Sequence, residues 1–450
     1  MIKIFKTLSK KIGIDGSIAY SSGARIVQAF TGVGSVFFIS FYLTEVEQGF
    51  YYTFGSLLAL QVFFELGLSN ILTQYIAFES ANLYWTNESK LNGSKENLSR
   101  LSHLLHFSFK WYGVVGVLFG IFLIIGGIIF FTKYNANNDT VEWFLPWLLV
   151  STSTILNLYS TPFLSILTGL DKVKEVAKLR FYQQLLVPLF TWLGLALDLG
   201  LFVLGIGQFC SFLLCIIWLV KTPMFRILSN IWKEKIAERV NYKKEIFPYQ
   251  WKIAVSWISG YFVLQLFNPV LFAKEGAIIA GQMGMTLVAF TAMSAFSQSW
   301  INTKIPAMTK LIARKEYQTL DNLFYKTVKQ LNLVFLILLF GFFLFIYILR
   351  FYQFTLGDRF LPWLPLFLIA IPIYVSQFVN AWAIYLRCHK KEPLLLYSVI
   401  AGVLCCLSTL ILGSEYGVIG MTGGYCIIIC SLSFWVHYMF KKLKNQWHKN

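Results

Sequence analysis

The sequence predicts an all-α polytopic membrane protein with twelve transmembrane helices, arranged as two six-helix lobes. Three observations support this fold class. First, 57% of the 450 residues are hydrophobic and only 13% are charged, and the mean hydropathy is +0.63, which is outside the range of soluble globular proteins. Second, basic residues gather in alternate loops between apolar segments. Third, one apolar pentapeptide recurs at matching positions in the two halves of the chain.

Twelve apolar segments are long enough to cross a bilayer, which takes roughly 20 residues of helix. Turn residues and charges mark their limits. The predicted spans lie near residues 17–43, 50–78, 107–131, 143–168, 178–197, 199–220, 251–273, 277–301, 330–353, 361–386, 394–413 and 417–440.

The distribution of the 38 Lys and Arg residues gives the orientation of these spans. If the N-terminus is cytoplasmic, the outer loops and the membrane together hold only Lys133, Lys274, Arg350, Arg359 and Arg25. All other basic residues then lie in inner segments, as the positive-inside rule requires, so both termini are expected in the cytoplasm. The net charge of +17 follows from this bias. It therefore indicates membrane lipids as partners and no nucleic acid.

The pentapeptide FLPWL opens the fourth span at 144–148 and the tenth span at 360–364. Six spans per half give both halves the same orientation, so we expect a parallel pseudo-two-fold repeat about an axis along the membrane normal. The predicted domains are an N-terminal six-helix lobe at 1–220, a cytoplasmic amphipathic linker on the inner leaflet at 221–250, and a C-terminal six-helix lobe at 251–450. A substrate site between such lobes is typical of transporters that open alternately to each side.

Arg25 is a charged residue inside the first span, where it costs at least a few kcal/mol unless a partner or water offsets it. At helical spacing it shares a stripe with Gln28 and with the small residues Ser21, Gly32 and Ser35. This face is expected to look into protein or a wet cavity, where Arg25 would bind an anion. Alternatively, Arg25 lies close enough to the cytoplasmic end of the span to reach the lipid headgroups.

Glu65 lies near the middle of the second span, roughly 7 Å further from the inner surface than Arg25. An arginine side chain can span that distance, so the two residues can form a structural ion pair. The functional interpretation is that Glu65 releases Arg25, or takes up a proton or Na⁺, during a transport cycle. No resident cofactor and no metal site are predicted.

Further candidate residues are an amide and several cations. Asn70 belongs to a group of amides within or near the spans, which either bond helices together or line a sugar-binding cavity. Arg180, Lys304 and Arg387 lie near predicted cytoplasmic ends of spans. They either join Arg25 in a cationic entrance or simply follow the positive-inside bias.

Three stretches resemble Wzx-type polysaccharide flippases of the multidrug/oligosaccharidyl-lipid/polysaccharide (MOP) exporter superfamily. They are LTEVEQGFY at 43–51, FELGLSN at 64–70 and QSWINTKIPAMTKLIARK at 298–315. The resemblance implies a MATE-like fold of two six-helix lobes around a cationic cavity. It also implies a flippase of the bacterial inner membrane that handles O-antigen or capsule repeat units.

According to this resemblance, the ligand is an oligosaccharide linked by pyrophosphate to undecaprenol. It passes from the cytoplasmic to the periplasmic leaflet by alternating access. Arg25 matches the place of an arginine in the first span of the related lipid II flippases. The partners that the resemblance suggests are a polysaccharide polymerase and the chain-length machinery.

Two alternatives stay open. A multidrug or organic-cation exporter of the same fold would need an acidic, aromatic cavity; Arg25 argues against this function and Glu65 argues for it. A polytopic glycosyltransferase would use Glu45 and Glu47 of the first outer loop as a metal-binding pair. Such enzymes usually hold their acceptor with a large external loop, and the predicted outer loops are short.

Overall fold

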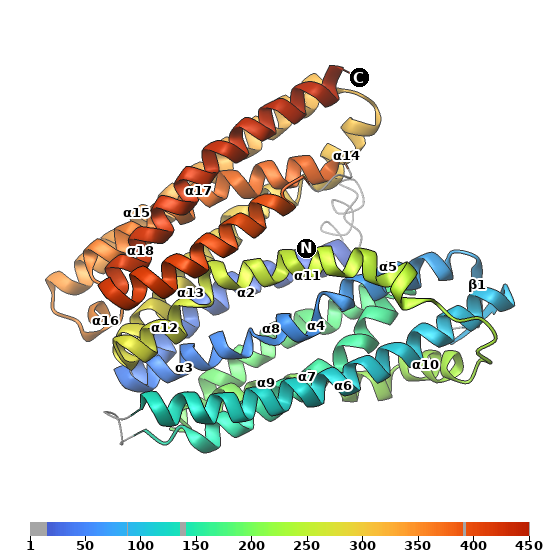
Figure 1. Ribbon diagram of the computed structural model, residues 1–450, viewed down its shortest axis with the longest axis horizontal. Helices are drawn as coiled ribbons and strands as arrows, with labels where there is room; N and C mark the ends of the chain where they lie inside the picture. Colours follow the sequence, from blue (N-terminus) through green and yellow to red (C-terminus); the bar gives the residue numbers. More distant parts are fainter. Residues whose placement is uncertain (1–15, 88, 136–140, 390–392, 450) are drawn as a thin grey trace, which may run out of the picture. The chain divides into compact units, whose positions relative to one another are not determined.

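The computed structural model describes residues 16–87, 89–135, 141–389 and 393–449, and most of them are helical (Figure 1). Every predicted span coincides with helical structure. The uninterrupted helices are α2 (Gly16–Tyr42), α6 (Lys95–Tyr134), α7 (Phe144–Gly169), α8 (Val173–Ala196), α9 (Phe202–Lys221), α13 (Ala277–Asn302), α15 (Tyr317–Phe351) and α17 (Trp363–Cys388). The last two spans fall on α18 (Leu395–Lys449), which is kinked at Gly417, where φ is 58° and ψ is −143°.

Six helices of the described chain are long and apolar enough to cross a bilayer, or eight if each of two bent helix pairs is one span. The remaining predicted spans fall on α2, α7, α8 and the second part of α18. Helices suit the hydrocarbon region because they satisfy their backbone hydrogen bonds internally. The chain is therefore a multi-pass, all-α membrane protein.

The second predicted span is broken into α3 (Glu45–Leu58), α4 (Gln61–Glu65) and α5 (Leu68–Ser80), with a bend of 44°. It begins before the predicted limit of residue 50 because Thr44 and Glu47 form a capping box. The seventh span is bent as well. There η1 (Tyr242–Ile246) leads into α11 (Phe247–Leu264), and α12 (Phe267–Lys274) follows at 40°.

A small antiparallel sheet, β1 (Leu83–Asn87) and β2 (Lys90–Gly93), joins α5 to α6 and is absent from the prediction. The predicted linker contains α10 (Met224–Trp232), which packs beside this hairpin. Asn230 Nδ2 donates a hydrogen bond to the carbonyl oxygen of Ser89 at 2.9 Å. The apolar stripe of α10 is buried in the protein and consists of Met224, Ile227, Leu228 and Ile231.

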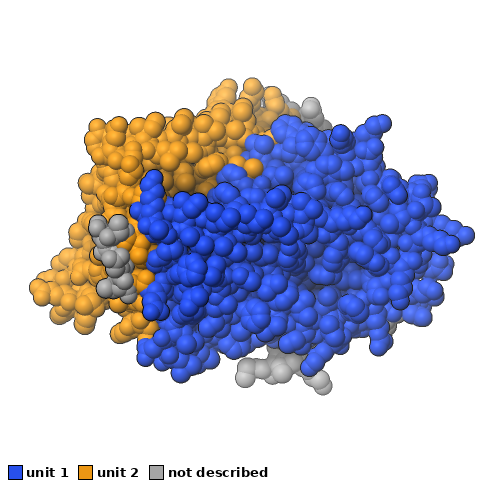
Figure 2. All heavy atoms as spheres, turned by 60° about the horizontal axis from the view of Figure 1, so that its bottom comes forward, with its two compact units in different colours: residues 1–27, 60–133, 142–257 blue, residues 28–59, 134–141, 258–450 orange. Residues whose placement is uncertain are grey.

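Contacts divide the chain into two compact units, coloured blue and orange in Figure 2. The first unit comprises 60–133 and 142–257 with the beginning of α2 up to residue 27. The second comprises 258–450 with 28–59 and 134–141. The end of α2 and all of α3 therefore pack with the C-terminal half of the chain. The division into lobes at 1–220 and 251–450 stays a prediction.

In the second unit, α3 packs closely against α13. A Cβ at Gly49 would lie 2.0 Å from the carbonyl oxygen of Ala277, so only glycine fits there. Next to it, the buried Gln48 donates through Nε2 to a backbone carbonyl of α13 at 2.9 Å. Arg359, which follows α16 (Thr355–Asp358), donates to the carbonyl oxygen of Leu43 at 2.8 Å. These contacts hold the start of α3 to segments more than 200 residues away in sequence.

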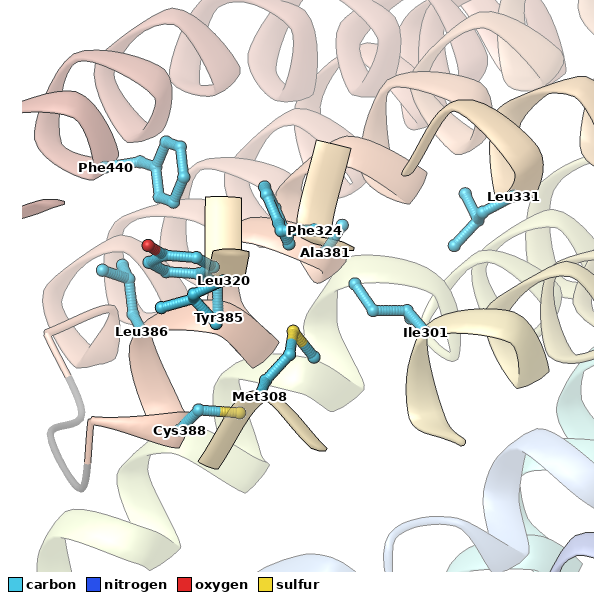
Figure 3. Close-up of a cluster of buried hydrophobic side chains, with 10 residues drawn as sticks. All are labelled: Ile301, Met308, Leu320, Phe324, Leu331, Ala381, Tyr385, Leu386, Cys388 and Phe440. Carbon is cyan, nitrogen blue, oxygen red and sulfur yellow. The ribbon is translucent and has the colours of Figure 1, made fainter. Parts of the chain in front are cut away.

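A core cluster of the second unit joins α13, α14 (Ile305–Ala313), α15, α17 and α18 (Figure 3). Its buried members are Ile301, Met308, Leu320, Phe324, Leu331, Ala381, Tyr385, Leu386, Cys388 and Phe440. At its edge, the Tyr385 hydroxyl donates to Asp321 Oδ1 at 2.8 Å, and Lys444 Nζ lies 2.6 Å from Asp321 Oδ2. These polar contacts fix the end of α18 against α15 and α17.

Candidate functional site

Arg25 and Gln28 both lie on the backbone of α2. Their side chains are outside the described residues. The anion-binding role of Arg25, and its pairing with Glu65, therefore stay predictions.

Further along α2, the two predicted faces of the helix have different surroundings. Phe30, Val33 and Phe37, which lie off the polar stripe, are exposed. Gly32 lies on the stripe, and a Cβ there would be 3.3 Å from Ala292 Cβ of α13. At this level of α2, the stripe that contains small residues faces protein.

Glu65 ends α4 and is buried, with 8% of its surface exposed. The Tyr112 hydroxyl donates to Oε1 at 3.2 Å, and Gln61 Nε2 donates to Oε2 at 3.3 Å. Among the side chains that the structure describes, none forms an ion pair with Glu65. It is also the only acidic residue in the twelve predicted spans. A buried carboxylate held by neutral donors is a suitable position for a proton or a monovalent cation to bind.

The helix break next to Glu65 consists of two left-handed residues, Leu66 (φ 52°) and Gly67 (φ 67°). A Cβ at Gly67 would lie 2.5 Å from Ile253 Cγ2, so α5 approaches α11 at this point. A break leaves the last carbonyl groups of α4 and the first N–H groups of α5 without helical partners. Discontinuous helices of this kind build ion and substrate sites in many transporters. Glu65 and this break form the candidate site of the first unit.

Asn70, just after the break, is exposed, and so is Gln74 one turn later on the same face. Within the described part of the chain, neither side chain forms a hydrogen bond. The opposite face of α5 carries Leu68, Leu72 and Ile76, which are fully buried. Because lipid cannot hydrogen-bond an amide, Asn70 and Gln74 suit a surface that borders water or a polar ligand.

The three predicted entrance cations are all exposed. Arg180 lies on α8 of the first unit. Lys304 directly precedes α14 and Arg387 lies in the last turn of α17, both in the second unit. Exposure fits a role in attracting an anionic headgroup, and a shared entrance stays a prediction.

Other amides within the spans are used inside the protein. Asn157 Nδ2 donates to the carbonyl oxygen of Gln208 at 2.7 Å, which bonds α7 to α9. Gln377 Nε2 donates to Ser294 Oγ at 2.9 Å, which bonds α17 to α13. The structure thus separates amides that join helices from the exposed pair on α5, a distinction that sequence does not make.

The acidic pair Glu45 and Glu47 has a structural explanation. The Glu47 carboxylate accepts hydrogen bonds from the Thr44 N–H at 2.8 Å and from its hydroxyl at 2.9 Å, which caps α3. The negative charges of both carboxylates also affect the pKa of Arg359. Burial lowers the pKa of its guanidinium, and the two negative charges raise that pKa in opposition. This pair therefore gives no specific support to a metal-dependent glycosyltransferase.

Sequence reasoning missed Tyr112, which donates to Glu65 from 47 residues away. A tyrosine in an apolar run gives no signal of this partner, since the contact depends on how α6 packs. The break itself had a weak signal, because Gly67 interrupts the span. Leu66 gave none, since a leucine seldom takes the left-handed conformation.

No protein-family model matches the chain, and no curated protein does. Solved structures of transporters match nearly its whole length. The inward-facing conformation of a multidrug resistance MATE family transporter of the MOP superfamily is 12% identical, with a TM-score of 0.61 over 95% of this chain and 94% of that chain. The outward-facing conformation of a MATE family transporter gives 12% identity and a TM-score of 0.60, covering 97% of both chains.

The lipid II flippase MurJ, in an inward closed conformation, is 15% identical with a TM-score of 0.56, over 94% of this chain and 87% of that chain. Identities this low establish the fold alone. The chain therefore has the MATE-like fold of MOP superfamily transporters, an all-α polytopic architecture of twelve helices in two lobes.

Proposed function

We propose that this chain is a flippase that moves a pyrophosphate-linked oligosaccharide lipid from the cytoplasmic to the periplasmic leaflet of a bacterial inner membrane. The observation that carries the proposal is the chemistry of the spans. Their only acidic residue, Glu65, is buried against Tyr112, while Asn70 and Gln74 are exposed within the predicted second span. Such a surface suits sugar hydroxyls better than an organic cation.

The fold supports this proposal. MATE transporters and the lipid II flippase MurJ share it, so the architecture serves both a drug exporter and a protein that flips a lipid. Fold alone does not choose between these substrates. The distribution of charge in the spans supports the flippase, because an anionic headgroup is attracted by cations and repelled by exposed carboxylates.

The mechanism follows from the cost of crossing hydrocarbon. A pyrophosphate and glycan headgroup cannot cross unaided, since each unsatisfied polar group costs several kcal/mol there. Exposed amides replace water for the sugars, and Arg25 would bind the pyrophosphate. Arg180, Lys304 and Arg387 would draw the headgroup to the cytoplasmic side. The polyprenyl tail stays in lipid while the lobes open alternately to each leaflet.

The experiment that tests the flippase is transbilayer movement of a pyrophosphate-linked oligosaccharide lipid in proteoliposomes. Arg25→Ala should abolish movement, and Arg25→Lys should retain part of it because the charge remains. Arg314→Ala is the matched control, since it removes a cation whose side chain is 72% exposed. Normal movement of the lipid with Arg25→Ala would show that Arg25 does not bind the substrate. No movement with the parent protein would refute the flippase.

Glu65 is the residue that we propose for coupling to H⁺ or Na⁺. Its carboxylate stands at a helix break, and a bound cation would compete with the bonds from Tyr112 and Gln61. Glu65→Gln removes the charge and keeps the shape of the side chain. Flipping by this variant should become independent of an imposed H⁺ or Na⁺ gradient. A variant that still responds to the gradient as the parent does would place coupling elsewhere.

A multidrug or organic-cation exporter is the second candidate, and Glu65 is the observation that favours it. A carboxylate at membrane depth can exchange a proton for a cationic drug. In that case the parent protein would transport tetraphenylphosphonium in proteoliposomes, and Glu65→Gln would abolish that transport. Movement of the lipid-linked oligosaccharide without tetraphenylphosphonium transport would decide for the flippase.

A further inference from the structure

The helix α5 has a neighbour in the first unit, the helix α11 (Figure 1). At the start of α5, a Cβ at Gly67 would lie 2.5 Å from Ile253. Near its end, the Tyr75 hydroxyl donates a hydrogen bond to the carbonyl oxygen of Glu245, just before α11 begins. Residue numbers therefore increase along α5 in the direction in which they decrease along α11. The two helices lie side by side and are antiparallel.

The helical spacing of α11 shows which side chains border α5. Ile253 points towards it, and Tyr249 and Trp257 lie one turn to either side of Ile253 on the same stripe. Gln250 and Ala254 lie further round the helix and are buried in the unit. Tyr249 is 63% exposed and Trp257 is 37% exposed, so neither ring is enclosed by the helices packed around α11.

Two exposed amides on α5 and two exposed aromatic rings on α11 thus lie on adjacent antiparallel helices. Asn70 and Gln74 can each donate and accept hydrogen bonds, which matches the neighbouring hydroxyls of a sugar ring. The electron-rich faces of Tyr249 and Trp257 suit the C–H groups on one side of a pyranose. Tyr249 and Trp257 are eight residues apart, which is about 12 Å along a helix and leaves room for a short run of linked sugars.

We propose that Asn70, Gln74, Tyr249 and Trp257 form a sugar-binding strip for the glycan of the transported headgroup. The strip rests on the proposed function for the class of its ligand. None of its four side chains carries a formal charge at neutral pH, so it selects neutral sugar rings and leaves the pyrophosphate to the cations. It thereby separates recognition of the glycan from recognition of the phosphate.

The test compares two probes that differ in the glycan alone. One is the pool of lipid-linked oligosaccharides from the bacterium that encodes this chain, and the other is undecaprenyl pyrophosphate without sugar. Their Kd values are measured on the full-length protein in lipid nanodiscs. The double variant Asn70→Ala/Gln74→Ala should weaken binding of the sugar-bearing probe roughly tenfold or more, because two hydrogen bonds are lost. Its Kd for the sugar-free probe should stay unchanged.

Further variants separate the rings from the amides. Tyr249→Phe/Trp257→Phe keeps aromatic faces and should retain binding within a few-fold, whereas Tyr249→Leu/Trp257→Leu should lose it as the amide variant does. Thr152→Ala is the matched control because Thr152 is an exposed hydroxyl within a span of the same unit. It should change neither Kd.

Each of the following outcomes would refute the sugar-binding strip, the proposed function or both. An unchanged Kd for the sugar-bearing probe in the amide and leucine variants would refute the strip and leave the flippase standing. Equal weakening of both probes would also refute it, because sugar contacts cannot act on the sugar-free lipid. A parent protein that binds neither probe would refute the proposed function and the strip with it.

Discussion

Replacing Arg100 by Gln should destabilise the first unit by about 3 kcal/mol. Arg100 on α6 pairs with Glu79 at the end of α5, at 2.8 Å, and with Glu245 of η1, at 2.6 Å. The Glu79 side chain is only 2% exposed and that of Arg100 is 20% exposed. Removing one partner of a buried ion pair costs about 3–5 kcal/mol, because a charge is left buried without compensation. The partial exposure of Arg100 and Glu245 places the expected loss at the lower end of this range.

The assay is unfolding of the purified protein by titration with SDS in mixed micelles, compared with Arg314→Gln as the matched control. Arg314 lies 3.9 Å from Glu316, and these side chains are 72% and 45% exposed, so its loss should cost less than about 1 kcal/mol. Adding Glu79→Gln to Arg100→Gln should restore part of the stability, because the unpaired buried charge disappears.

Two results would refute this reasoning. One is a free energy of unfolding for Arg100→Gln that equals that of Arg314→Gln. The other is a double variant no more stable than Arg100→Gln alone. The ion pairs also hold η1, and with it the beginning of α11, against α5. Arg100→Gln should therefore weaken binding of the sugar-bearing probe as well.

Two glycine pairs give further predictions. Gly127→Ala should destabilise the protein by about 1–3 kcal/mol, because a Cβ there would lie 2.2 Å from the Trp147 ring, whereas Gly126→Ala meets no atom within 4 Å and should be neutral or stabilising. Gly49→Ala should lower the Tm by forcing α3 away from α13, and Gly55→Ala, on an open part of α3, should not. Each pair is compared by thermal unfolding in one detergent, and equal Tm values within either pair would contradict it.

The positions of the spans were predictable because apolar length and charged loops mark a membrane helix. The predicted span 143–168 corresponds to α7 (Phe144–Gly169), and 361–386 to α17 (Trp363–Cys388). The hairpin of β1 and β2 escaped prediction because its strands have five and four residues. Segments so short carry little periodicity, and their pairing depends on the tertiary contact with α10.

The two copies of the repeated pentapeptide have the same sequence but different packing. Trp147, in the first copy, is fully buried against Gly127. Trp363, in the second copy, is 37% exposed, and the Arg350 guanidinium lies 4.8 Å from its ring centroid. The first copy lies within α7, whereas α17 begins only at Trp363. The same five residues therefore mark the start of a long helix in both halves but pack differently in each.

The candidate site was predictable only as a set of residue types. Sequence singles out Glu65 because an acid at membrane depth is expensive. It does not show that Tyr112 holds the carboxylate or that Asn70 is exposed while Asn157 is bonded inside the protein. These facts depend on how neighbouring helices pack, which periodicity does not determine.

The break between α4 and α5 joins the proposed coupling residue to the proposed sugar-binding strip. Glu65 ends one helix, and Asn70 opens the exposed face of the next. Hydrogen bonds to a charged group contribute about 1.5–3 kcal/mol each to stability. The bonds from Tyr112 and Gln61 together therefore stabilise this arrangement of Glu65 by about 3–6 kcal/mol. Shifting a two-state equilibrium from about 1:99 to 99:1 takes about 5.5 kcal/mol. In the proposed coupling, a cation at Glu65 must therefore compensate for the loss of both bonds before it can shift α5 about the left-handed pair, so it has to bind one arrangement of α5 much more tightly than the other.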